Sequence, residues 1–362
     1  MRVLTIAFVI VLMLPAVVLA WGFHDAMENG SAIVCVTPRS SAMGGVWSLP
    51  SSGAASVFLN PAELSLLNGT SINATTAIVQ WNSVITGELN YDHYISGNTG
   101  AVTIAAGTEI SDAVSIGAGI SRVSDFNFNG INDILEDIGF QEYKIYAIDF
   151  LDSQGSLWEA NTGISVIIND WLTAGVSGGI RFGSGSWNLR HNVINPLGVD
   201  DTTIVEWEES DFCSHVGILM PFTFGTFGIS GTNSTDRYRS RVAVGFQRDF
   251  SVLNGGTLGT EIDIQSIEEK NPAVSGRMFA CLSGILPNVR SIYSVGFIRA
   301  SDYQRAALCI GTGASIDFER MNIDLGVSWM SRSRAGFAFN EPLIHNIDDA
   351  GTYYSAGLSW RL

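Results

Sequence analysis

The sequence lacks a long apolar run beyond its first twenty residues. After Ala20, no stretch reaches the ~18 consecutive apolar residues that a membrane-spanning helix needs. Charged residues make up only 15% of the chain, and the formal net charge of −16 argues against a nucleic-acid partner, whose phosphates would be repelled. The apolar content is instead spread thinly in short pieces. A membrane β-barrel needs that dilution, because each strand faces lipid with alternate residues only.

Recognisable catalytic, zinc and redox motifs are also absent from the sequence. Cys35, Cys213, Cys281 and Cys309 show no CxxC spacing, so no zinc or redox motif is indicated. Export would permit disulfides, but four isolated small apolar residues are the simpler interpretation. Residues 175–179 fit G-x-S-x-G, yet they continue an alternating strand, whereas a nucleophile elbow needs a strand–turn–helix. We therefore expect no enzyme.

The first twenty residues resemble a secretory signal peptide. Arg2 gives a positive start, Val3–Leu19 is almost wholly apolar, and Val18-Leu19-Ala20 supplies a small-residue cleavage site. An uncleaved membrane anchor is the alternative. We expect residues 1–20 to be removed and the mature chain to begin at Trp21.

Apolar and polar residues alternate in many short runs along the rest of the chain. In residues 320–330 one face carries Met321, Ile323, Leu325, Val327 and Trp329, and the other is polar or glycine. Runs within 114–121, 158–166, 173–182 and 260–267 behave alike. The pattern predicts an all-β fold: a transmembrane antiparallel β-barrel of about 14 strands over residues 68–362. Alternation alone also fits a secreted soluble β-sandwich. In a barrel, glycines on the polar face suggest a crowded lumen or bends.

Two further features favour the barrel. The last strand alternates up to the final residue, and Gly357, Trp360 and Leu362 resemble the C-terminal pattern that barrel-insertion machinery recognises, with Leu362 in place of the usual terminal aromatic. The connections also alternate in length. Short turns are predicted near 168–170, 286–288 and 318–320, on the periplasmic side, and long external loops at 124–155, 183–211, 231–239 and 331–350.

The segment after the signal peptide carries two small-residue motifs. One runs from Pro38 to Val46 and includes Arg39, Met43, Gly44 and Gly45; the other ends in Asn60-Pro61-Ala62. Their order and spacing resemble the start of the long-chain fatty-acid transporter superfamily (FadL type), in particular its PorV/PorQ-like branch. The stretch 157–183 also resembles that branch. Asn60 can cap a short helix that begins at Pro61.

The resemblance implies a short N-terminal helical plug, residues 21–67, inside the lumen of an outer-membrane barrel. It implies a barrel that passes or binds hydrophobic molecules such as long-chain fatty acids. The alternative is a PorV-like barrel that docks secreted proteins or secretion machinery at the cell surface. A capped helix that merely leads into the first strand also remains open. Outer-membrane lipid and the barrel-insertion machinery are the other expected partners.

Residues 125–136 match the spacing of a calcium loop. Asp125, Asn127, Asn129, Asp133 and Glu136 offer side-chain oxygens, Ile131 would offer a carbonyl, and a glycine stands at the sixth position. The sequence predicts a free-standing Ca²⁺ loop here, and an Asn/Gly-rich turn without metal is the alternative.

Charged residues also fall on the polar faces of the predicted strands. We expect them to pair across the lumen; a role in selectivity is the alternative. They are Glu159, Arg181, Glu261, Asp263, Asp324 and Arg361.

Overall fold

The computed structural model describes residues 31–32, 36–51, 53–86, 92–137, 143–193, 201–250, 256–265, 267, 273–286, 288–299, 304–337 and 344–362. The predicted signal peptide, residues 1–20, lies outside the described residues. So do residues 21–30 of the predicted plug segment, and Cys35.

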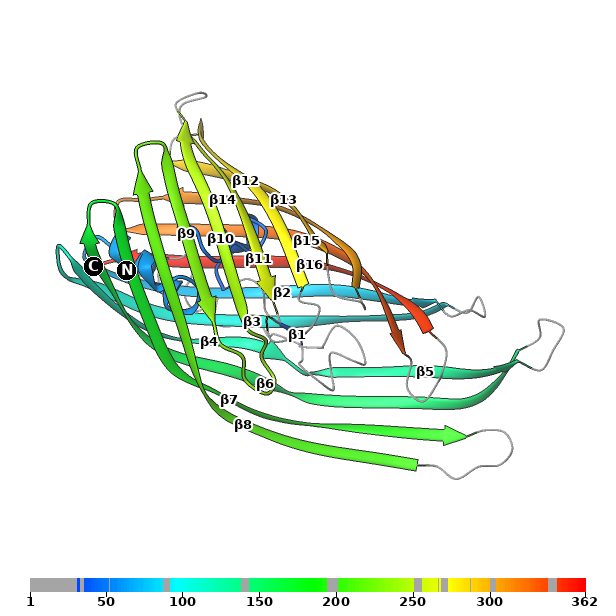
Figure 1. Ribbon diagram of the computed structural model, residues 1–362. Helices are drawn as coiled ribbons and strands as arrows, with labels where there is room; N and C mark the ends of the chain where they lie inside the picture. Colours follow the sequence, from blue (N-terminus) through cyan, green and yellow to red (C-terminus); the bar gives the residue numbers. More distant parts are fainter. Residues whose placement is uncertain are drawn as a thin grey trace, which may run out of the picture.

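Fourteen antiparallel strands close into a single barrel (Figure 1), which confirms the predicted fold class and strand number. The ring is complete because β16 pairs with β2 and β4 pairs with β6. The strands of the ring are β2 (Thr70–Thr86), β3 (Asp92–Ser111), β4 (Val114–Asp125), β6 (Tyr143–Asn169), β7 (Leu172–Val193), β8 (Asp201–Phe222), β9 (Gly225–Thr232), β10 (Arg241–Phe250), β11 (Gly256–Gln265), β12 (Ala273–Leu286), β13 (Val289–Arg299), β14 (Gln304–Asp317), β15 (Met321–Phe337) and β16 (Ile344–Arg361).

Apolar side chains cover the outside of the barrel and polar side chains fill its lumen. In β7, Val176 and Ile180 are 50% and 52% exposed, whereas Ser177 and Arg181 are 2% and 0% exposed. This arrangement is typical of a barrel surrounded by lipid. The closed ring excludes the β-sandwich that alternation alone left open. Across the described ranges, no helix is both long and apolar enough to cross a bilayer.

The two ends of the barrel differ. Near the C-terminus the connections are short: Asp170–Trp171 links β6 to β7, and Thr223–Phe224 links β8 to β9. At the opposite end β6, β7 and β8 run far beyond their neighbours (Figure 1), and β5 (Phe128–Asp137) pairs with β6 there. We call this extension the blade. The long external loops predicted at 124–155 and 183–211 are therefore wrong in large part. Strand pairing continues there, although the outward positions become polar and the alternation fades.

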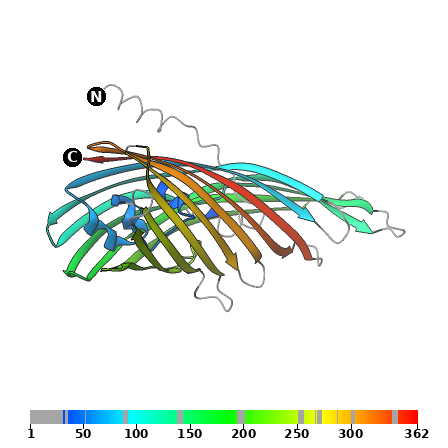
Figure 2. The same ribbon diagram turned by 90° about the horizontal axis from the view of Figure 1, so that it is seen from above.

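Three short helical elements lie inside the barrel, toward its short-turn end (Figure 2). They are α3 (Pro38–Ala42) and two 3₁₀ helices, η1 (Gly53–Phe58) and η2 (Pro61–Leu66). Residues 36–51 and 53–67, named here the luminal segment, supply much of the buried apolar surface of the protein. The remaining element, β1 (Ser31–Ala32), pairs with β4.

Candidate functional site

Glycines of the barrel wall make room for the luminal segment. A Cβ on Gly217 would lie 1.9 Å from the side-chain oxygen of Asn60, and one on Gly175 would lie 2.4 Å from the Ala62 nitrogen. No side chain fits at such distances, so glycine is required there. At other wall glycines a Cβ would lie between 1.9 and 2.9 Å from the luminal segment: Gly107, Gly117, Gly119, Gly228, Gly245, Gly311, Gly313, Gly326 and Gly357. The lumen is therefore crowded, one of the two expectations drawn from the polar-face glycines.

The Met43-Gly44-Gly45 motif forms the turn that ends α3. Gly44 and Gly45 have φ angles of +82° and +83°, which side-chain-bearing residues rarely adopt. Their N–H groups donate to the carbonyls of Ser41 and Ser40, at 2.9 and 2.7 Å. The two glycines thus satisfy the last carbonyls of α3 and turn the chain toward the opposite wall.

The Asn60-Pro61-Ala62 motif begins η2. The Asn60 side-chain oxygen accepts from the Ala62 N–H at 3.1 Å, and Pro61 occupies the first helical position, where its missing N–H does no harm. The Asn60 amide donates to the Ser48 carbonyl at 2.7 Å. Asn60 therefore ties η2 to the loop that follows α3.

That loop is held by a buried carboxylate of the wall. Glu261 accepts from the Trp47 N–H at 3.0 Å and from the Ser48 N–H and hydroxyl at 2.7 Å. Arg277 lies 3.1 Å from the same carboxylate. Burial in the lumen makes such charge-assisted hydrogen bonds strong, and it also makes them costly to lose.

Two arginines continue this network along the wall. Arg241 pairs with Asp263 at 2.6 Å, and Arg277 pairs with Asp263 at 2.9 Å. The Arg241 guanidinium also lies 4.0 Å from the centre of the Trp47 ring, a cation–π contact with the luminal segment. The charges of the network are thus paired, and one of its faces is turned to the loop after α3.

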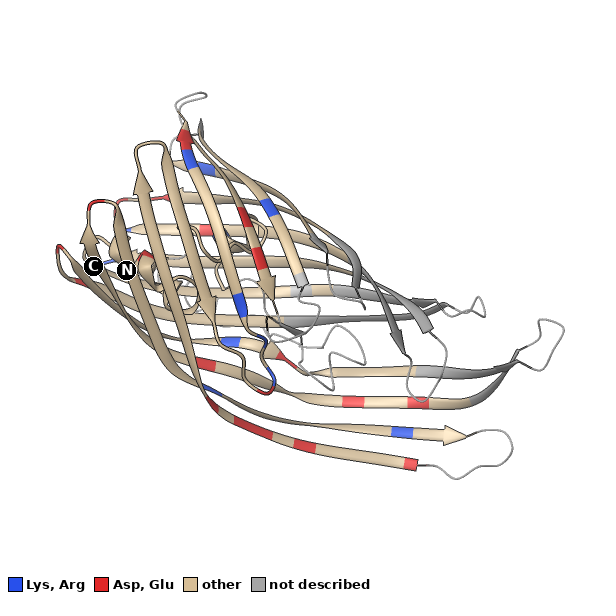
Figure 3. Ribbon diagram, in the orientation of Figure 1, with Lys and Arg blue, Asp and Glu red and all other residues tan. Residues whose placement is uncertain are grey.

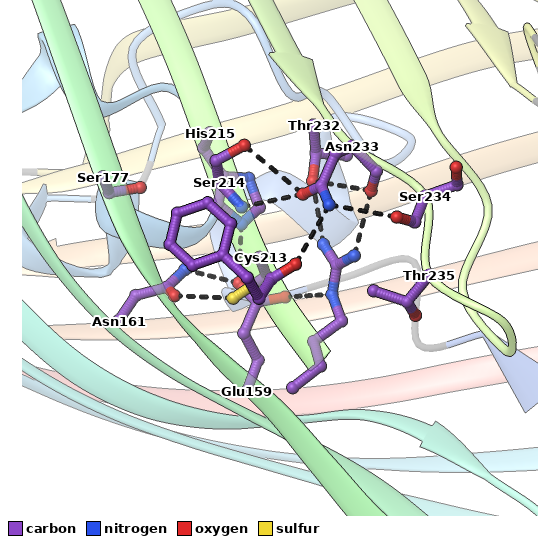
Figure 4. A network of polar contacts seen from close by, with 12 residues as sticks. Glu159, Asn161, Ser177, Cys213, Ser214, His215, Thr232, Asn233, Ser234 and Thr235 are labelled. Atoms are coloured by element: carbon purple, nitrogen blue, oxygen red, sulfur yellow. Dashed lines mark hydrogen bonds and ion pairs between the residues drawn. The ribbon is translucent and has the colours of Figure 1, made fainter. Parts of the chain in front are cut away.

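A second buried network lies on β6, β7 and β8 (Figure 4). Glu159 pairs with Arg181 at 2.7 Å and with Nε2 of His215 at 2.6 Å. Because a carboxylate only accepts, Nε2 carries the hydrogen. Beside it, the Ser177 hydroxyl donates to the carbonyl of Val57 at 2.6 Å, which anchors η1 to the wall. Glu159 and Arg181 therefore pair as predicted, but between neighbouring strands and not across the lumen.

The loop between β9 and β10 closes over this second network. The Tyr238 ring lies 3.9 Å from the Arg181 guanidinium, and burial raises the pKa of its phenol to about 12. Arg181 also donates to the Thr232 hydroxyl and to the Asn233 carbonyl, at 2.8 and 2.9 Å. Tyr238 therefore stays neutral at physiological pH, and its ring covers one face of the Arg181 guanidinium.

The barrel wall is interrupted between β3 and β4. Their pairing runs from Ser111↔Val114 to Thr103↔Ser121 and stops there, although β3 extends back to Asp92. Within the described part of the chain, residues 92–102 of β3 pair with β2 alone. We call the region between β3 residues 92–102 and β4 residues 122–125 the slot. The two-residue strand β1 lies in it, because Ala32 and Ser31 pair with Ser124 and Asp125 on the edge of β4 that does not face β6.

The β4 edge of the slot turns into the barrel. Val123, Ser124 and Asp125 are all buried, so the alternation seen elsewhere ends. A register shift between Arg122 and Ser124 marks this change. Arg122 reaches back across the slot and donates to the Gly100 carbonyl at 3.3 Å while pairing with Asp125 at 2.9 Å.

An aromatic cluster lies inside the barrel next to the slot. Val123, Phe126, Leu157 and Trp207 form one buried group, and the Phe126 and Trp207 rings are 4.5 Å apart. The Arg237 guanidinium lies 4.5 Å from the Trp207 ring. An apolar molecule that crossed the slot would meet this cluster first.

A cavity of about 450 Å³ opens at the short-turn end, beneath the luminal segment. Arg39 of the first motif lines it, as do the predicted luminal charges Asp324 and Arg361. Arg290 and Asp317, also on its lining, pair at 3.2 Å. The cavity is polar at its rim and is bounded above by η2.

The predicted calcium residues are not brought together. Phe128–Asp137 is strand β5, not a loop. A strand advances ~3.3 Å per residue, so a run from Asn129 to Glu136 covers roughly 23 Å, far more than one coordination sphere spans. Asp125 is buried and accepts from Asn127, whereas Asn129 is exposed. The side chains of Asp133 and Glu136 lie outside the described residues, and Ile131 faces outward.

Elsewhere the described residues hold no cluster of three or more His, Cys, Asp or Glu with metal-ligand geometry. Calcium binding stays a prediction. In the conformation described here it would require β5 to leave β6.

The three C-terminal residues of the predicted insertion pattern lie on β16 and at its end. Gly357 faces the ring of Pro38, Trp360 pairs with Ile72 of β2, and Leu362 is 71% exposed. Their recognition by insertion machinery stays a prediction.

Sequence reasoning missed several residues of the site. Arg241, Arg277 and His215 occupy polar-face positions of alternating strands, so the pattern that placed Glu261 in the lumen could have placed them there too. Trp207 could not be assigned to the lumen in this way, because the alternation of apolar and polar residues fades in that part of β8.

Comparison with known proteins rests on structure alone. No protein-family model matches the chain, and no curated protein sequence matches it. Among solved structures, the toluene transporter TodX of Pseudomonas putida has a TM-score of 0.66 at 11% identity, over 92% of this chain and 99% of that one. The toluene transporter TbuX of Ralstonia pickettii has a TM-score of 0.58 at 12% identity, over 93% and 99%. The chain therefore has the fold of these transport barrels.

Proposed function

We propose that this chain is a bacterial outer-membrane barrel that passes hydrophobic small molecules and performs no enzymatic chemistry. The observation that carries the proposal is the slot, because β3 and β4 do not pair there and release of the two-residue strand β1 would let an apolar molecule leave the lumen sideways into lipid. The aromatic cluster beside it supports the proposal, since it offers apolar contact along that route. The apolar outer surface and the polar lumen support an outer-membrane location.

The cargo is proposed only as a class. The N-terminal resemblance implies long-chain fatty acids, whereas the similar solved structures are toluene transporters. Long-chain fatty acids and toluene are both largely apolar molecules that a lipid bilayer would take up. In this proposal residues 21–67 act as a plug, and the luminal segment shifts to open a route past the wall.

Export and assembly complete the proposal. Residues 1–20 would direct the chain across the inner membrane, and Gly357, Trp360 and Leu362 would be read by the barrel-insertion machinery. Outer-membrane lipid would then surround the apolar band.

A disulfide across the slot tests the function. Val102 and Arg122 are the next pair in register beyond Thr103↔Ser121. We expect the double variant Val102→Cys/Arg122→Cys to form a disulfide that links β3 to β4 once it is oxidised. This link should stop uptake of the neutral probe 1-N-phenylnaphthylamine by cells that express the barrel. Reduction should restore uptake.

Each single-cysteine variant serves as control, because the native Cys213, Cys281 and Cys309 remain in place. Uptake that persists in the oxidised double variant, with the crosslink shown by mass spectrometry, would contradict passage through the slot.

The PorV-like docking role is the second candidate, and the blade is the observation that favours it. The blade extends the sheet of β5–β8 beyond its neighbours (Figure 1), and acidic residues recur along its strand β8. Under this alternative, exported proteins would co-purify with the intact chain, and loss of the blade would abolish that association while probe uptake stayed absent throughout.

A further inference from the structure

The outer face of β6–β8 changes from apolar to polar in a single step. Trp158 pairs with Phe182 in the last outward row before two polar rows. The next outward row is Ser156↔Ser184↔Glu208, and the one beyond is Gln154↔Ser186↔Glu206. Rows on one face of a strand are ~7 Å apart, and aromatic residues mark the edge of the hydrocarbon. The two polar rows therefore lie at the level of the lipid headgroups.

These two rows line a hollow rather than a flat surface. A groove of about 710 Å³ runs over them, within the size range of ligand sites. The groove is open and shallow, and its floor lies where Gly155 pairs with Gly185 between the two rows. Trp207 closes its floor from the lumen side, since a Cβ on Gly185 would lie 2.6 Å from that indole ring. Arg122 and Asn127 form the edge nearest the slot.

The groove offers hydrogen-bond donors and acceptors in roughly equal measure. Serine hydroxyls and side-chain amides do both, two carboxylates accept, and Arg122 donates. Arg122 and Trp207 of the lining each hold one buried N–H, at Nε and Nε1, that has no partner within the described residues. Sugar hydroxyls, which both donate and accept, match this lining better than any group of single polarity.

Charge narrows the ligand further. Glu206 and Glu208 contribute −2 and Arg122 contributes +1 to the lining, a formal sum of −1. Acidic positions also recur along β8 through the blade (Figure 3). A phosphorylated or otherwise anionic headgroup would be repelled, whereas a neutral sugar would not.

We propose that this groove binds the neutral sugar headgroup of a glycolipid in the outer leaflet. A lipid is favoured over a free sugar because the exposed apolar residues Phe182 and Phe212 lie directly beneath the polar rows, where acyl chains would rest. The site is on the outside of the wall and does not depend on what the lumen carries.

The test uses the full chain in phosphatidylcholine nanodiscs that contain a small fraction of diglucosyl diacylglycerol. Native mass spectrometry of the released protein counts retained lipids. We expect about tenfold enrichment of the glycolipid over phosphatidylcholine, equivalent to ~1.4 kcal/mol. Ser184→Trp should abolish the enrichment by filling the groove. Thr260→Trp, an exposed outward residue on β11 far from the lining, should retain it.

Equal enrichment in all three proteins, or none in the wild type, would overturn the proposal. So would stronger retention of phosphatidylglycerol than of the neutral glycolipid, or displacement of the glycolipid by free maltose. Unchanged uptake of 1-N-phenylnaphthylamine by Ser184→Trp shows that the barrel is folded and separates this site from the passage.

Discussion

At the scale of single residues, wall and lumen fit each other through glycines as much as through charges. Asn60 illustrates this fit, because its side chain occupies the space that a side chain at position 217 would need. It reaches the Ser48 carbonyl only because that space is free.

We therefore expect Gly217→Ala to destabilise the barrel by about 1–3 kcal/mol, the usual cost of overpacking. The matched control is Gly231→Ala on the neighbouring strand, where a Cβ would meet its nearest neighbour at an ordinary 3.5 Å. The control should change stability by no more than about 0.5 kcal/mol. The urea midpoint of the folded band on semi-native gels measures both, and equal midpoints would refute the close-fit argument.

Much of the residue-scale chemistry could be predicted from the sequence, but its pairing could not. Alternation assigned Glu159, Arg181, Glu261 and Asp263 to the lumen, and the structure agrees. Which guanidinium meets which carboxylate depends on the register between strands. The pairing of Arg241 with Asp263 across β10 and β11 could therefore not be predicted.

At the scale of elements, the luminal segment is held mainly through the loop after α3. Glu261 is the single carboxylate that receives the Trp47 and Ser48 N–H groups. A glutamine there would present an amide N–H to one of these donors, and it would leave Arg277 without one of its two carboxylates.

We expect Glu261→Gln to cost about 3 kcal/mol, in the range for breaking a buried ion pair, and to loosen the luminal segment. Single-channel recording in planar bilayers should then show frequent openings that the wild type lacks. Asp249→Asn is the control, because Asp249 is exposed and its carboxylate accepts from the Thr257 hydroxyl, away from the luminal segment. Identical traces for Glu261→Gln and wild type would exclude this role.

The alternating runs 114–121, 158–166, 173–182 and 321–330 were predicted as strands and lie in strands, whereas the slot and the blade were not predicted. A slot is a relation between two strands, and nothing in β3 or β4 taken alone marks where they separate. The run 125–136 shows the opposite error. Its Asn, Asp and Gly content is typical of a turn, yet pairing with β6 satisfies its backbone and keeps it extended.

At the scale of the whole molecule, the outer surface and the lumen place tryptophans in different surroundings. Trp329 faces outward and is 37% exposed, whereas Trp47 lies in the lumen and is 4% exposed. Brominated phosphatidylcholine quenches only indoles that touch lipid. We expect Trp329→Phe to lower the quenched fraction of the total fluorescence and Trp47→Phe to raise it. The opposite changes in the two variants would contradict the outward position of Trp329 and the luminal position of Trp47.

The ring of wall glycines also bears on how the chain assembles. Because these glycines have no side chains, they leave space along the inner wall that the luminal segment fills. A barrel without the luminal segment would therefore contain a cavity along its wall. We expect the pairing of β16 with β2 to close the ring around a luminal segment that is already in position. Folding would then depend on the luminal segment, around which the strands that follow it in the sequence assemble into the barrel.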